Sequence, residues 1–397
     1  MERGSVCPQR SLDATGLSVL HVVQPGEGGV ARVVLDLVTA QVEQGFTVSL
    51  ACPAGTPLAE SAAGLGCELL DWQSTRSPVR HVVRESRHLA ELIARVRPDV
   101  VHAHSAKAGL VARVVLRGRI PTVFQPHAWS FEAVDSRTSA LALRWERWAA
   151  RWTTRVVCVS EAERLRGQQA GVRTRFSVVQ NGVDPARFTF DTDPHAARRA
   201  LPALAAGRSN ESPVVVCVGR LCMQKGQDTL LQAWDSVVAR FPDARLALVG
   251  DGPTGDELRR IAPPSVTFAG AVPDTAPWYR AADLVVLPSR WEGIAVAPLE
   301  AMATGRAVVV TDVDGSRESL PPAHHPLSLV PPDDPAALAS AVIRLLDQAE
   351  LRTSLGRQGR QHVLSHFTVQ RVGAAIADVY REVAVGRHHK FREPVSP

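Results

Sequence analysis

The sequence has few residues of several types, and each shortage excludes a class of protein. Only six of its 397 residues are cysteine, and none forms a metal-binding pair, so we expect reduced thiols. No apolar run approaches the roughly 18 residues that a transmembrane helix needs. The first residues, MERGSVCPQRSLDATG, lack the apolar centre of a secretory signal peptide. These shortages favour a cytoplasmic globular protein.

Lysine is also scarce, since it occurs only at positions 107, 225 and 390, and arginine supplies the other basic charges. An internal lysine such as Lys225 therefore stands out. The formal net charge of +5 is compatible with anionic ligands or a membrane surface and by itself proves neither. No array of basic and aromatic residues is typical of a nucleic-acid module, so we expect no nucleic-acid partner.

Short apolar runs alternate with stretches of helical period in both halves of the chain, which predicts two doubly wound parallel sheets. Between the halves, residues 182–212 are rich in Pro, Asp, Arg and Ala, and predict a linker with one short helix. We predict domains over residues 1–185 and 186–367, with a ligand site in the cleft between them. The predicted strands are 17–23, 46–52, 67–72, 99–104, 121–127, 155–160, 176–181, 214–219, 245–250, 266–270, 283–287, 307–311 and 327–330.

The stretch PSRWEGIAVAPLEAMATG places Glu292 and Glu300 eight residues apart. It follows a predicted buried strand, and a helix is predicted to begin near Ala297. Glu292 then lies in a loop at the carboxyl edge of the sheet, where ligands bind, and Glu300 lies in the first helical turns. The two carboxylates can grip hydroxyls at two points of one ligand, while backbone N–H groups from Gly293 onward face an anion. The alternative is that each Glu is only a helix cap or dipole partner.

Two cations lie near the start of the second domain. Arg220 directly follows a predicted strand, and Lys225 precedes a helix predicted from Gln227. A strand end, two cations and a helix N-terminus suit a diphosphate, because Arg clamps phosphate oxygens and Lys supplies a compact charge. The alternative is a solvated loop with incidental cations.

Two glycine-rich turns also follow strands. Gly26, Gly28 and Gly29 follow the first strand and allow a ligand to approach the backbone closely. GDGPTG, at residues 250–255, is a literal G-x-G-x-x-G and supports a nicotinamide-dependent oxidoreductase as an alternative function. Because Pro253 interrupts it and it follows the second strand of its domain, we interpret it as a structural turn.

Other residues carry weaker signals. Asp312 and Asp314 resemble a metal-binding D-x-D, but two cations already supply the charge that a metal would bring, so we expect no metal. His127 ends a predicted strand and can bond a ligand hydroxyl or a backbone carbonyl. His102 and His104 end another strand, and we expect them to be packed histidines.

Two basic amphipathic stretches suggest contact with a membrane surface. Residues 80–97 place Arg80, Arg84 and Arg87 at helical spacing, opposite an apolar face. Residues 144–155 place three tryptophans on one face. The alternative, which we favour for both, is a core-facing helix with a solvated arginine edge.

Together these residues resemble the family-4 glycosyltransferases, retaining enzymes of the GT-B fold. The resemblance covers roughly residues 17–385 and rests most specifically on the E-x7-E pattern of Glu292 and Glu300 joined to the upstream Arg/Lys pair. The weaker matching segments are GEGGVARV, VHAHS, FQPHAW, VVCVSEAE, QNGVD, VGRLCMQKG, LVGDGP and VTFAGAV.

The resemblance implies a GT-B architecture of two Rossmann-like domains, with a C-terminal helix of about 368–386 that crosses back to the first domain. It implies that Arg220 and Lys225 hold the donor diphosphate, Glu292 the donor hexose and Glu300 the ribose, with His127 near the reaction centre. No divalent metal or other cofactor is expected. The implied backbone contacts to the donor come from Gly28, Gly29, Gly252, Ala271, Val272, Gly293, Ile294, Ala295 and Val296.

The expected reaction is transfer of a hexosyl group from a nucleotide-diphosphate sugar, with uridine as the favoured base, to an acceptor hydroxyl. Cell-envelope polysaccharide, glycolipid and specialised-metabolite synthesis all remain open. A sugar-nucleotide binding protein without catalysis is a further alternative. The chain departs from the family pattern at Gln180, where a proline is usual, and around Gly315, where paired glycines are frequent.

Overall fold

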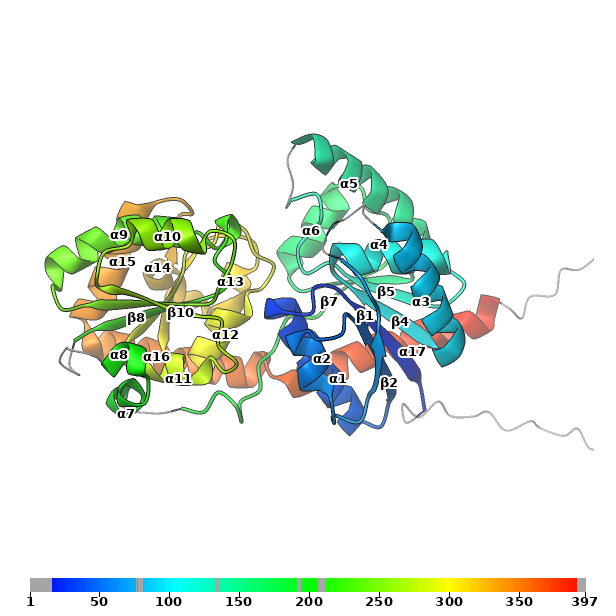
Figure 1. Cartoon of the computed structure of the whole chain (residues 1–397), viewed down its shortest axis with the longest axis horizontal. Helices are drawn as coiled ribbons and strands as arrows, with labels where there is room; N and C mark the ends of the chain where they lie inside the picture. The colour runs from blue at the N-terminus through cyan, green and yellow to red at the C-terminus, as the bar shows by residue number, and fades with distance from the viewer. Residues whose placement is uncertain are drawn as a thin grey trace, which may run out of the picture.

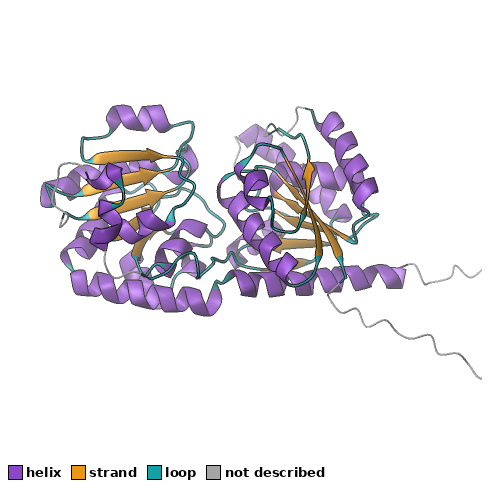
Figure 2. Ribbon diagram, turned by 60° about the horizontal axis from the view of Figure 1, so that its bottom comes forward, coloured by secondary structure: helices purple, strands orange, loops and turns teal. Residues whose placement is uncertain are grey.

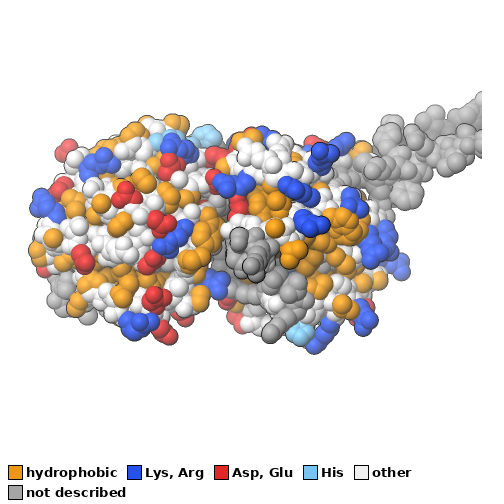
Figure 3. Space-filling view, turned by 90° about the horizontal axis from the view of Figure 1, so that it is seen from above, with side chains coloured by type: hydrophobic (Ala, Val, Ile, Leu, Met, Phe, Trp, Pro, Cys, Tyr) orange, Lys and Arg blue, Asp and Glu red, His pale blue; other side chains and the backbone are white. Residues whose placement is uncertain are grey.

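The computed structural model describes residues 16–75, 77, 81–132, 136–190, 194–205 and 212–390. They form two lobes, each built on a parallel sheet with helices packed on both faces (Figure 1). The space-filling view from above shows the two lobes meeting along a narrow seam (Figure 3).

The first sheet has seven parallel strands in the order β3-β2-β1-β4-β5-β6-β7. Its strands are short apolar runs because helices cover both faces of the sheet. The chain order reverses between β1 and β4, so the loops that follow these two strands diverge and leave a crevice at the carboxyl edge. The strands are β1 (Ser18–Val23), β2 (Thr47–Cys52), β3 (Glu68–Asp71), β4 (Val100–His104), β5 (Thr122–Gln125), β6 (Arg155–Cys158) and β7 (Phe176–Val178).

The helices of this lobe connect successive strands, since parallel pairing requires a crossover between them. They are α1 (Gly28–Glu43), α2 (Pro57–Ala62), α3 (Val82–Val96), α4 (Ser105–Leu116), α5 (Ser136–Ala149), the 3-10 turn η1 (Ala150–Trp152) and α6 (Glu161–Gln169).

The second sheet has six parallel strands in the order β10-β9-β8-β11-β12-β13, and its order reverses between β8 and β11. Its strands are β8 (Val214–Val218), β9 (Arg245–Val249), β10 (Val266–Gly270), β11 (Leu284–Leu287), β12 (Ala307–Thr311) and β13 (Leu329–Val330). Its helices and 3-10 turns are η2 (Met223–Lys225), α9 (Gln227–Arg240), α10 (Gly255–Ile261), α11 (Ala276–Ala281), α12 (Val296–Ala303), α13 (Ser316–Ser319), η3 (Pro322–His324), α14 (His325–Ser328), α15 (Pro335–Asp347) and α16 (Ala349–His366).

The chain passes between the lobes twice. It leaves the first lobe after β7 and returns after α16 as α17 (Val369–Lys390), which packs against α1 and β4. Figure 2 shows α16 and α17 running almost end to end beneath the two sheets. Ile376, Ala377 and Tyr380 of α17 are buried in the same apolar cluster as α1 and β1, so the last helix completes the core of the first lobe.

Every predicted strand is present, and the prediction of two doubly wound sheets is confirmed. The prediction of one short helix in the linker is wrong, since α7 (Pro194–Arg199) and α8 (Pro202–Ala205) are separate. Pro202 lacks an N–H group and therefore starts a new helix instead of continuing the first. Within the described residues, no helix is both long and apolar enough to cross a membrane.

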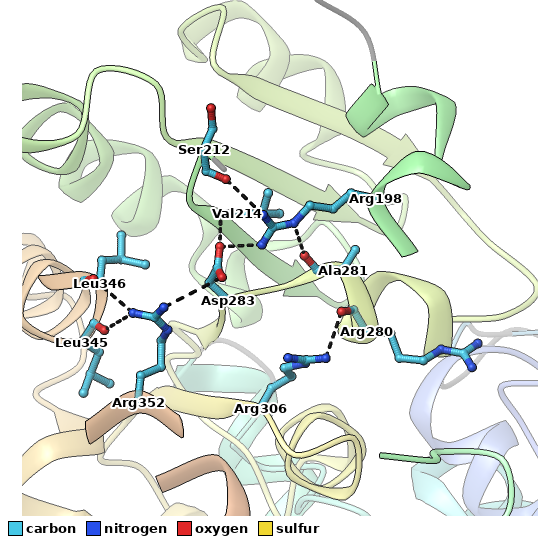
Figure 4. Close-up of polar contacts among 10 residues, drawn as sticks. All are labelled: Arg198, Ser212, Val214, Arg280, Ala281, Asp283, Arg306, Leu345, Leu346 and Arg352. Carbon is cyan, nitrogen blue, oxygen red and sulfur yellow. Dashed lines mark hydrogen bonds and ion pairs between the residues drawn. The ribbon is translucent and has the colours of Figure 1, made fainter. Parts of the chain in front are cut away.

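An ion-pair network anchors the linker to the second lobe at the edge of the sheet away from the site (Figure 4). Asp283, just before β11, accepts hydrogen bonds from the Arg198 guanidinium at 2.6 Å and from the Val214 N–H at 2.7 Å. Arg352 of α16 lies 3.9 Å from the other oxygen of Asp283. Arg198 is almost fully buried, so this pairing is what makes its burial tolerable.

Candidate functional site

The loops after β8 and β11 meet at the point where the second sheet reverses its order. They bring Lys225 and Glu292 together in an ion pair, and Ser289 Oγ donates to the same Glu292 oxygen at 2.7 Å. The Lys225 and Glu292 side chains are 19% and 9% exposed. Lysine and carboxylate thus hold each other at the crevice where ligands of open α/β sheets bind.

Backbone contacts lock these two loops together. Gly226 has φ +63°, and a Cβ there would lie 2.1 Å from the carbonyl oxygen of Pro288. The Arg290 N–H donates to the Gln224 carbonyl at 2.7 Å, and the Gln224 amide donates to the Trp291 carbonyl at 3.0 Å. The position of Lys225 relative to Glu292 is therefore fixed by the backbone as well as by charge.

Arg220 lies on the same edge with its side chain exposed. Its own carbonyl accepts a hydrogen bond from Gln227 at 3.0 Å, which holds its backbone against the start of α9. Among the residues that the structure describes, the Arg220 guanidinium has no carboxylate partner. It is therefore available to an anionic ligand.

Glu300 occupies a separate, buried position in α12. Tyr279 of α11 donates its hydroxyl to Glu300 Oε2 at 2.7 Å, and Thr275 Oγ1 lies 3.5 Å from the same oxygen. Burial raises the pKa of the Glu300 carboxyl, which the Tyr279 hydrogen bond and more distant arginines partly offset. Glu292 and Glu300 thus lie in two hydrogen-bond groups.

Sequence reasoning missed Tyr279. The chain contains only two tyrosines, Tyr279 and Tyr380, and each contacts a candidate site residue or its neighbours. The rarity of tyrosine was the feature of the sequence that could have pointed to Tyr279.

In the first lobe, the segments that follow β1 and β5 carry Gly28, Gly29 and His127. Gly28 has φ +76°, and a Cβ added at either glycine would meet no atom within 4 Å, so both border open space at the start of α1. His127 follows β5 with φ +57°, and its Nε2 lies 3.1 Å from His104 Nδ1. Burial lowers the pKa of His127 to about 3, so the ring is neutral near pH 7.

Glu163 holds the backbone beside His127. Its carboxylate accepts from the Ala128 N–H and from the Val159 N–H, each at 2.7 Å. Ala128 itself has φ +108°, an unusual conformation for alanine. The hydrogen bonds to Glu163 therefore hold a strained turn, which fixes the direction of the His127 side chain.

The two faces touch at the loop that follows Glu292. A Cβ added to Gly293 would lie 2.6 Å from Val159 Cγ2 and 4.0 Å from the Ala128 nitrogen. Asn181 of the first lobe donates its amide to the Ile294 carbonyl at 2.7 Å. The carboxyl edges of the two sheets thus face each other, and the Glu292 loop abuts the His127 turn.

A second interlobe contact joins α13 to α6. Glu318 accepts the backbone N–H groups of Glu161 and Ala162, at 2.8 and 2.9 Å, so a carboxylate of the second lobe caps a helix of the first. Gln180, which replaces the proline usual in the family, donates to the same carboxylate at 3.2 Å.

The D-x-D residues are each paired with an arginine. Asp312 pairs with Arg317, and Asp314 lies 2.5 Å from Arg166 of α6. The two carboxylates therefore have separate basic partners, one of them across the seam between the lobes. This arrangement gives no support to a shared metal at the pair.

The remaining donor candidates line the second lobe. Ala271 is exposed after β10, and Val272 is half-buried against the apolar core. Ile294 is buried, whereas Ala295 and Val296 are half-buried at the start of α12. The structure places these residues at the carboxyl edge or the adjoining helix start.

The glycines of GDGPTG have a packing role. A Cβ at Gly250 would lie 2.1 Å from the Gly219 carbonyl oxygen, and one at Gly252 would lie 2.2 Å from that of Leu221. Both glycines therefore allow the turn after β9 to press against the loop that carries Arg220. Gly252 thus supports the candidate site by packing against the Arg220 loop.

The basic helix α3 buries Leu89, Leu92 and Ile93 and exposes Arg84 and Arg87, as predicted for a core-facing helix. Arg80 lies outside the described residues.

The prediction that the tryptophan stripe faces the core is wrong, since Trp148 is 42% exposed and Arg151 stacks on its ring at 4.6 Å. The core side of α5 instead carries Glu146, which forms a buried pair with Arg113 at 2.7 Å.

Comparisons with known proteins agree with this architecture. Residues 27–187 match the family described as Glycosyltransferase Family 4, and residues 212–348 match Glycosyl transferases group 1. The chain is 25% identical to the UDP-Gal:alpha-D-GlcNAc-diphosphoundecaprenol alpha-1,3-galactosyltransferase of Escherichia coli, over 94% of this chain and 98% of that protein.

One further sequence relative and one solved structure are also similar to this chain. A GDP-mannose-dependent monoacylated alpha-(1-6)-phosphatidylinositol monomannoside mannosyltransferase of Corynebacterium glutamicum is 33% identical over 53% of this chain and 57% of that protein. The crystal structure of Anabaena HepE in complex with UDP-glucose superposes with a TM-score of 0.79 at 21% identity, over 92% of this chain and 100% of that one.

Proposed function

Because the chain belongs to the family-4 glycosyltransferases and is a nucleotide-sugar enzyme of the GT-B fold, we propose that it moves a hexosyl group from a UDP-sugar to a hydroxyl of a lipid-linked acceptor, with retention of configuration. The observation that carries the proposal is the set of charged groups at the β8/β11 crevice. An Arg220 guanidinium without a carboxylate partner among the described residues and the Lys225–Glu292 pair follow β8 and β11 at the carboxyl edge of the second sheet, and the buried Glu300 lies in α12, the helix that follows the Glu292 loop.

In this proposal Arg220 and Lys225 hold the donor diphosphate. Breaking the anomeric bond places negative charge on that diphosphate, and fixed cations stabilise it more than they stabilise the ground state. As the phosphate engages Lys225, Glu292 becomes free to accept a hydrogen bond from a donor-sugar hydroxyl. Glu300 accepts from the ribose. The arginine partners of Asp312 and Asp314 support a reaction without a divalent metal.

The choice of donor and acceptor follows the relatives. The Escherichia coli relative, which aligns over nearly the whole chain, is named for UDP-Gal, and the Anabaena neighbour binds UDP-glucose. The Corynebacterium relative is named for GDP-mannose, so GDP-mannose is the rival donor. Both relatives are named for acceptors carried on a lipid, diphosphoundecaprenol or phosphatidylinositol.

A panel of UDP-, GDP- and ADP-sugars, with NAD as comparison, tests the donor by thermal stabilisation. A ligand at a hundred times its Kd adds about 2.7 kcal/mol to the free energy of unfolding, which such an assay resolves easily. We expect a UDP-sugar to give the largest shift, followed by transfer to a lipid-linked saccharide. Stabilisation by NAD and by no sugar nucleotide would support the oxidoreductase instead. Donor binding without transfer or donor hydrolysis would leave a non-catalytic binding protein.

We also propose that the exposed face of α3 contacts the membrane that carries the acceptor. Arg84 and Arg87 lie on this face beside Val83, which is 66% exposed, so basic groups and one apolar side chain are accessible together to anionic lipid. Exchanging both arginines for glutamine should reduce binding to anionic liposomes while leaving donor binding unchanged. No binding of the unmodified protein to such liposomes would remove the idea.

A further inference from the structure

A continuous line of hydrogen bonds leads from the interior of the first lobe to His127. Gln41 Oε1 lies 2.8 Å from His21 Nε2, and His21 Nδ1 lies 3.0 Å from His104 Nε2. His104 Nδ1 in turn lies 3.1 Å from His127 Nε2. Three imidazoles and one amide thus form a chain in which every link joins side chains from different elements.

The topology of the first sheet creates this line. β1 and β4 are neighbours, with His21 opposite His102 and Val23 opposite His104. His102 and His104 are two residues apart on one strand, so their side chains share a face. His21, His102 and His104 are fully buried, whereas His127 is half-buried. His127 is therefore the end of the line that a ligand can reach.

The rings in this line are neutral. Burial lowers the pKa of His21 to about 4 and that of His127 to about 3, and the pKa of His104 is also lowered well below its usual value. The groups that face the rings are the neighbouring imidazoles, the Gln41 and Gln125 amides and the Tyr380 hydroxyl. Each neutral ring in the line carries one proton, so each hydrogen bond in the line uses a single N–H donor. All the rings therefore donate toward the same end of the line.

Gln41 sets that direction. Its carbonyl oxygen faces His21, while its amide nitrogen donates to the Tyr380 hydroxyl at 3.3 Å. Tyr380 in turn bonds His102 Nδ1 at 2.7 Å. Because an amide oxygen only accepts, His21 must carry its proton on Nε2, and the same then holds for His104 and for His127.

We propose that Gln41, His21 and His104 are positioning residues that fix His127 as the Nε2–H tautomer, so that its Nδ1 accepts a hydrogen bond from a substrate hydroxyl at the seam between the lobes. This inference rests on the proposed function, because it assigns His127 to sugar transfer. Residues of β1, β4 and α1 that do not contact the substrate would then also influence the reaction.

A metal held by His21, His102 and His104 is the rival explanation, since one ring nitrogen from each lies within 4.8 Å of the others. No carboxylate among the described residues joins this group. A divalent cation would therefore bring uncompensated charge into a buried site, which is strongly unfavourable. The existing hydrogen bonds also account for both ring nitrogens of His21 and of His104.

Nitrogen NMR of the histidine-labelled full-length protein tests the proposal directly, because imidazole shifts distinguish the two neutral tautomers. His127→Gln identifies the His127 signals. We expect Nε2–H in the wild type and a mixture of tautomers in His104→Gln. His102→Gln is the matched control, since His102 is equally buried on the same strand but bonds Tyr380 instead of His127.

Steady-state kinetics provide the second measurement. Removing a partner that orients a functional imidazole typically costs roughly 10- to 100-fold, as known for metal-bound histidines. We expect His104→Gln to lower kcat by about tenfold or more with little change in the donor KM, and His102→Gln to retain most of kcat. Gln41→Met, which alters the far end of the line on α1, should reproduce both the tautomer mixture and the loss of kcat if His104→Gln does not fold.

Three results would overturn the proposal: a wild-type His127 protonated on Nδ1, equal kinetic losses in the His102 and His104 variants, or stoichiometric zinc in the purified protein. If no donor supports transfer, the proposed function fails, and the tautomer measurement still decides whether Gln41 orients His127.

Discussion

The Lys225–Glu292 pair is the residue-scale feature on which the site depends. Each partner is partly buried and neutralises the other, so removing one leaves an uncompensated charge. Arg220, by contrast, is exposed and unpaired within the described part of the chain, so its loss should cost the fold little. In our proposal the two cations bind the same diphosphate, but only Lys225 also contributes to the stability of the fold.

This difference gives the first prediction. Arg220→Ala should lower transfer by about 100- to 1,000-fold, the cost of losing one donor to a developing oxyanion, with an unchanged melting temperature. Lys225→Met should lower both transfer and the melting temperature, because Glu292 then lies half-buried without a cationic partner. Kinetics and calorimetry on the two variants side by side measure the contrast. Near-normal activity of folded Arg220→Ala would contradict the phosphate assignment.

The second prediction concerns Tyr279. Tyr279→Phe removes the hydroxyl that bonds Glu300 and leaves a buried carboxylate short of a donor, at a cost of about 1–3 kcal/mol. We expect lower stability, a further rise in the pKa of Glu300 and weaker nucleotide binding. Free UDP titrated by calorimetry measures the last effect. Phe188→Leu, a change in the ring that packs on Tyr279 without touching that hydrogen bond, serves as the control.

At the scale of elements, the cap that α13 places on α6 controls how the lobes meet. Glu318→Ala removes two charge-assisted hydrogen bonds across the seam, each worth about 1.5–3 kcal/mol. We therefore expect the variant to sample a wider opening between lobes and to bind donor less tightly. Small-angle scattering measures the opening. Glu161→Ala, which alters α6 itself but keeps Glu318, is the matched control, and identical scattering from Glu318→Ala and wild type would refute the role.

The strands and most helices were predictable because a parallel strand covered on both faces must be an apolar run. The loop positions of Arg220, Lys225 and Glu292 followed from the same alternation. What the sequence did not reveal depends on contacts between distant residues. Tyr279 reaches Glu300 only because α11 packs beside α12. The exposure of Trp148 follows from the buried Glu146–Arg113 pair, which occupies the core side of its helix.

At the scale of the molecule, buried ionisable groups make stability depend on pH. Four histidines of the first lobe, His21, His102, His104 and His127, have folded pKa values below their unfolded value near 6.5, so their contribution is complete above that pH and is lost as pH falls. Asp36 and Glu163 act in the opposite sense, because burial raises their folded pKa values to about 6 and about 7.

The balance predicts acid lability. Near pH 5.5, the four histidines bind about four more protons in the unfolded chain than in the folded one, and the two carboxyls bind about two fewer. The unfolded chain therefore binds about two more protons in total, so the free energy of unfolding falls by about 3 kcal/mol per pH unit as the pH falls. The pKa values of His324 and His362 are lowered and those of Glu132 and Glu300 are raised, so these two pairs act in opposite senses. Urea unfolding between about pH 6.5 and about pH 5.5 should show a falling midpoint. A constant or rising midpoint would contradict it, and His104→Gln should flatten the dependence.

The return of α17 to the first lobe has a consequence for biosynthesis. Ile376, Ala377 and Tyr380 fill part of the interior formed by β1 and α1, yet they leave the ribosome after the whole second lobe. The lobe made first is thus finished last, and its nascent form exposes an unfilled apolar surface while some two hundred residues are still being synthesised. A ribosome stalled before α17 should carry a compact second lobe and a first lobe that still binds chaperones.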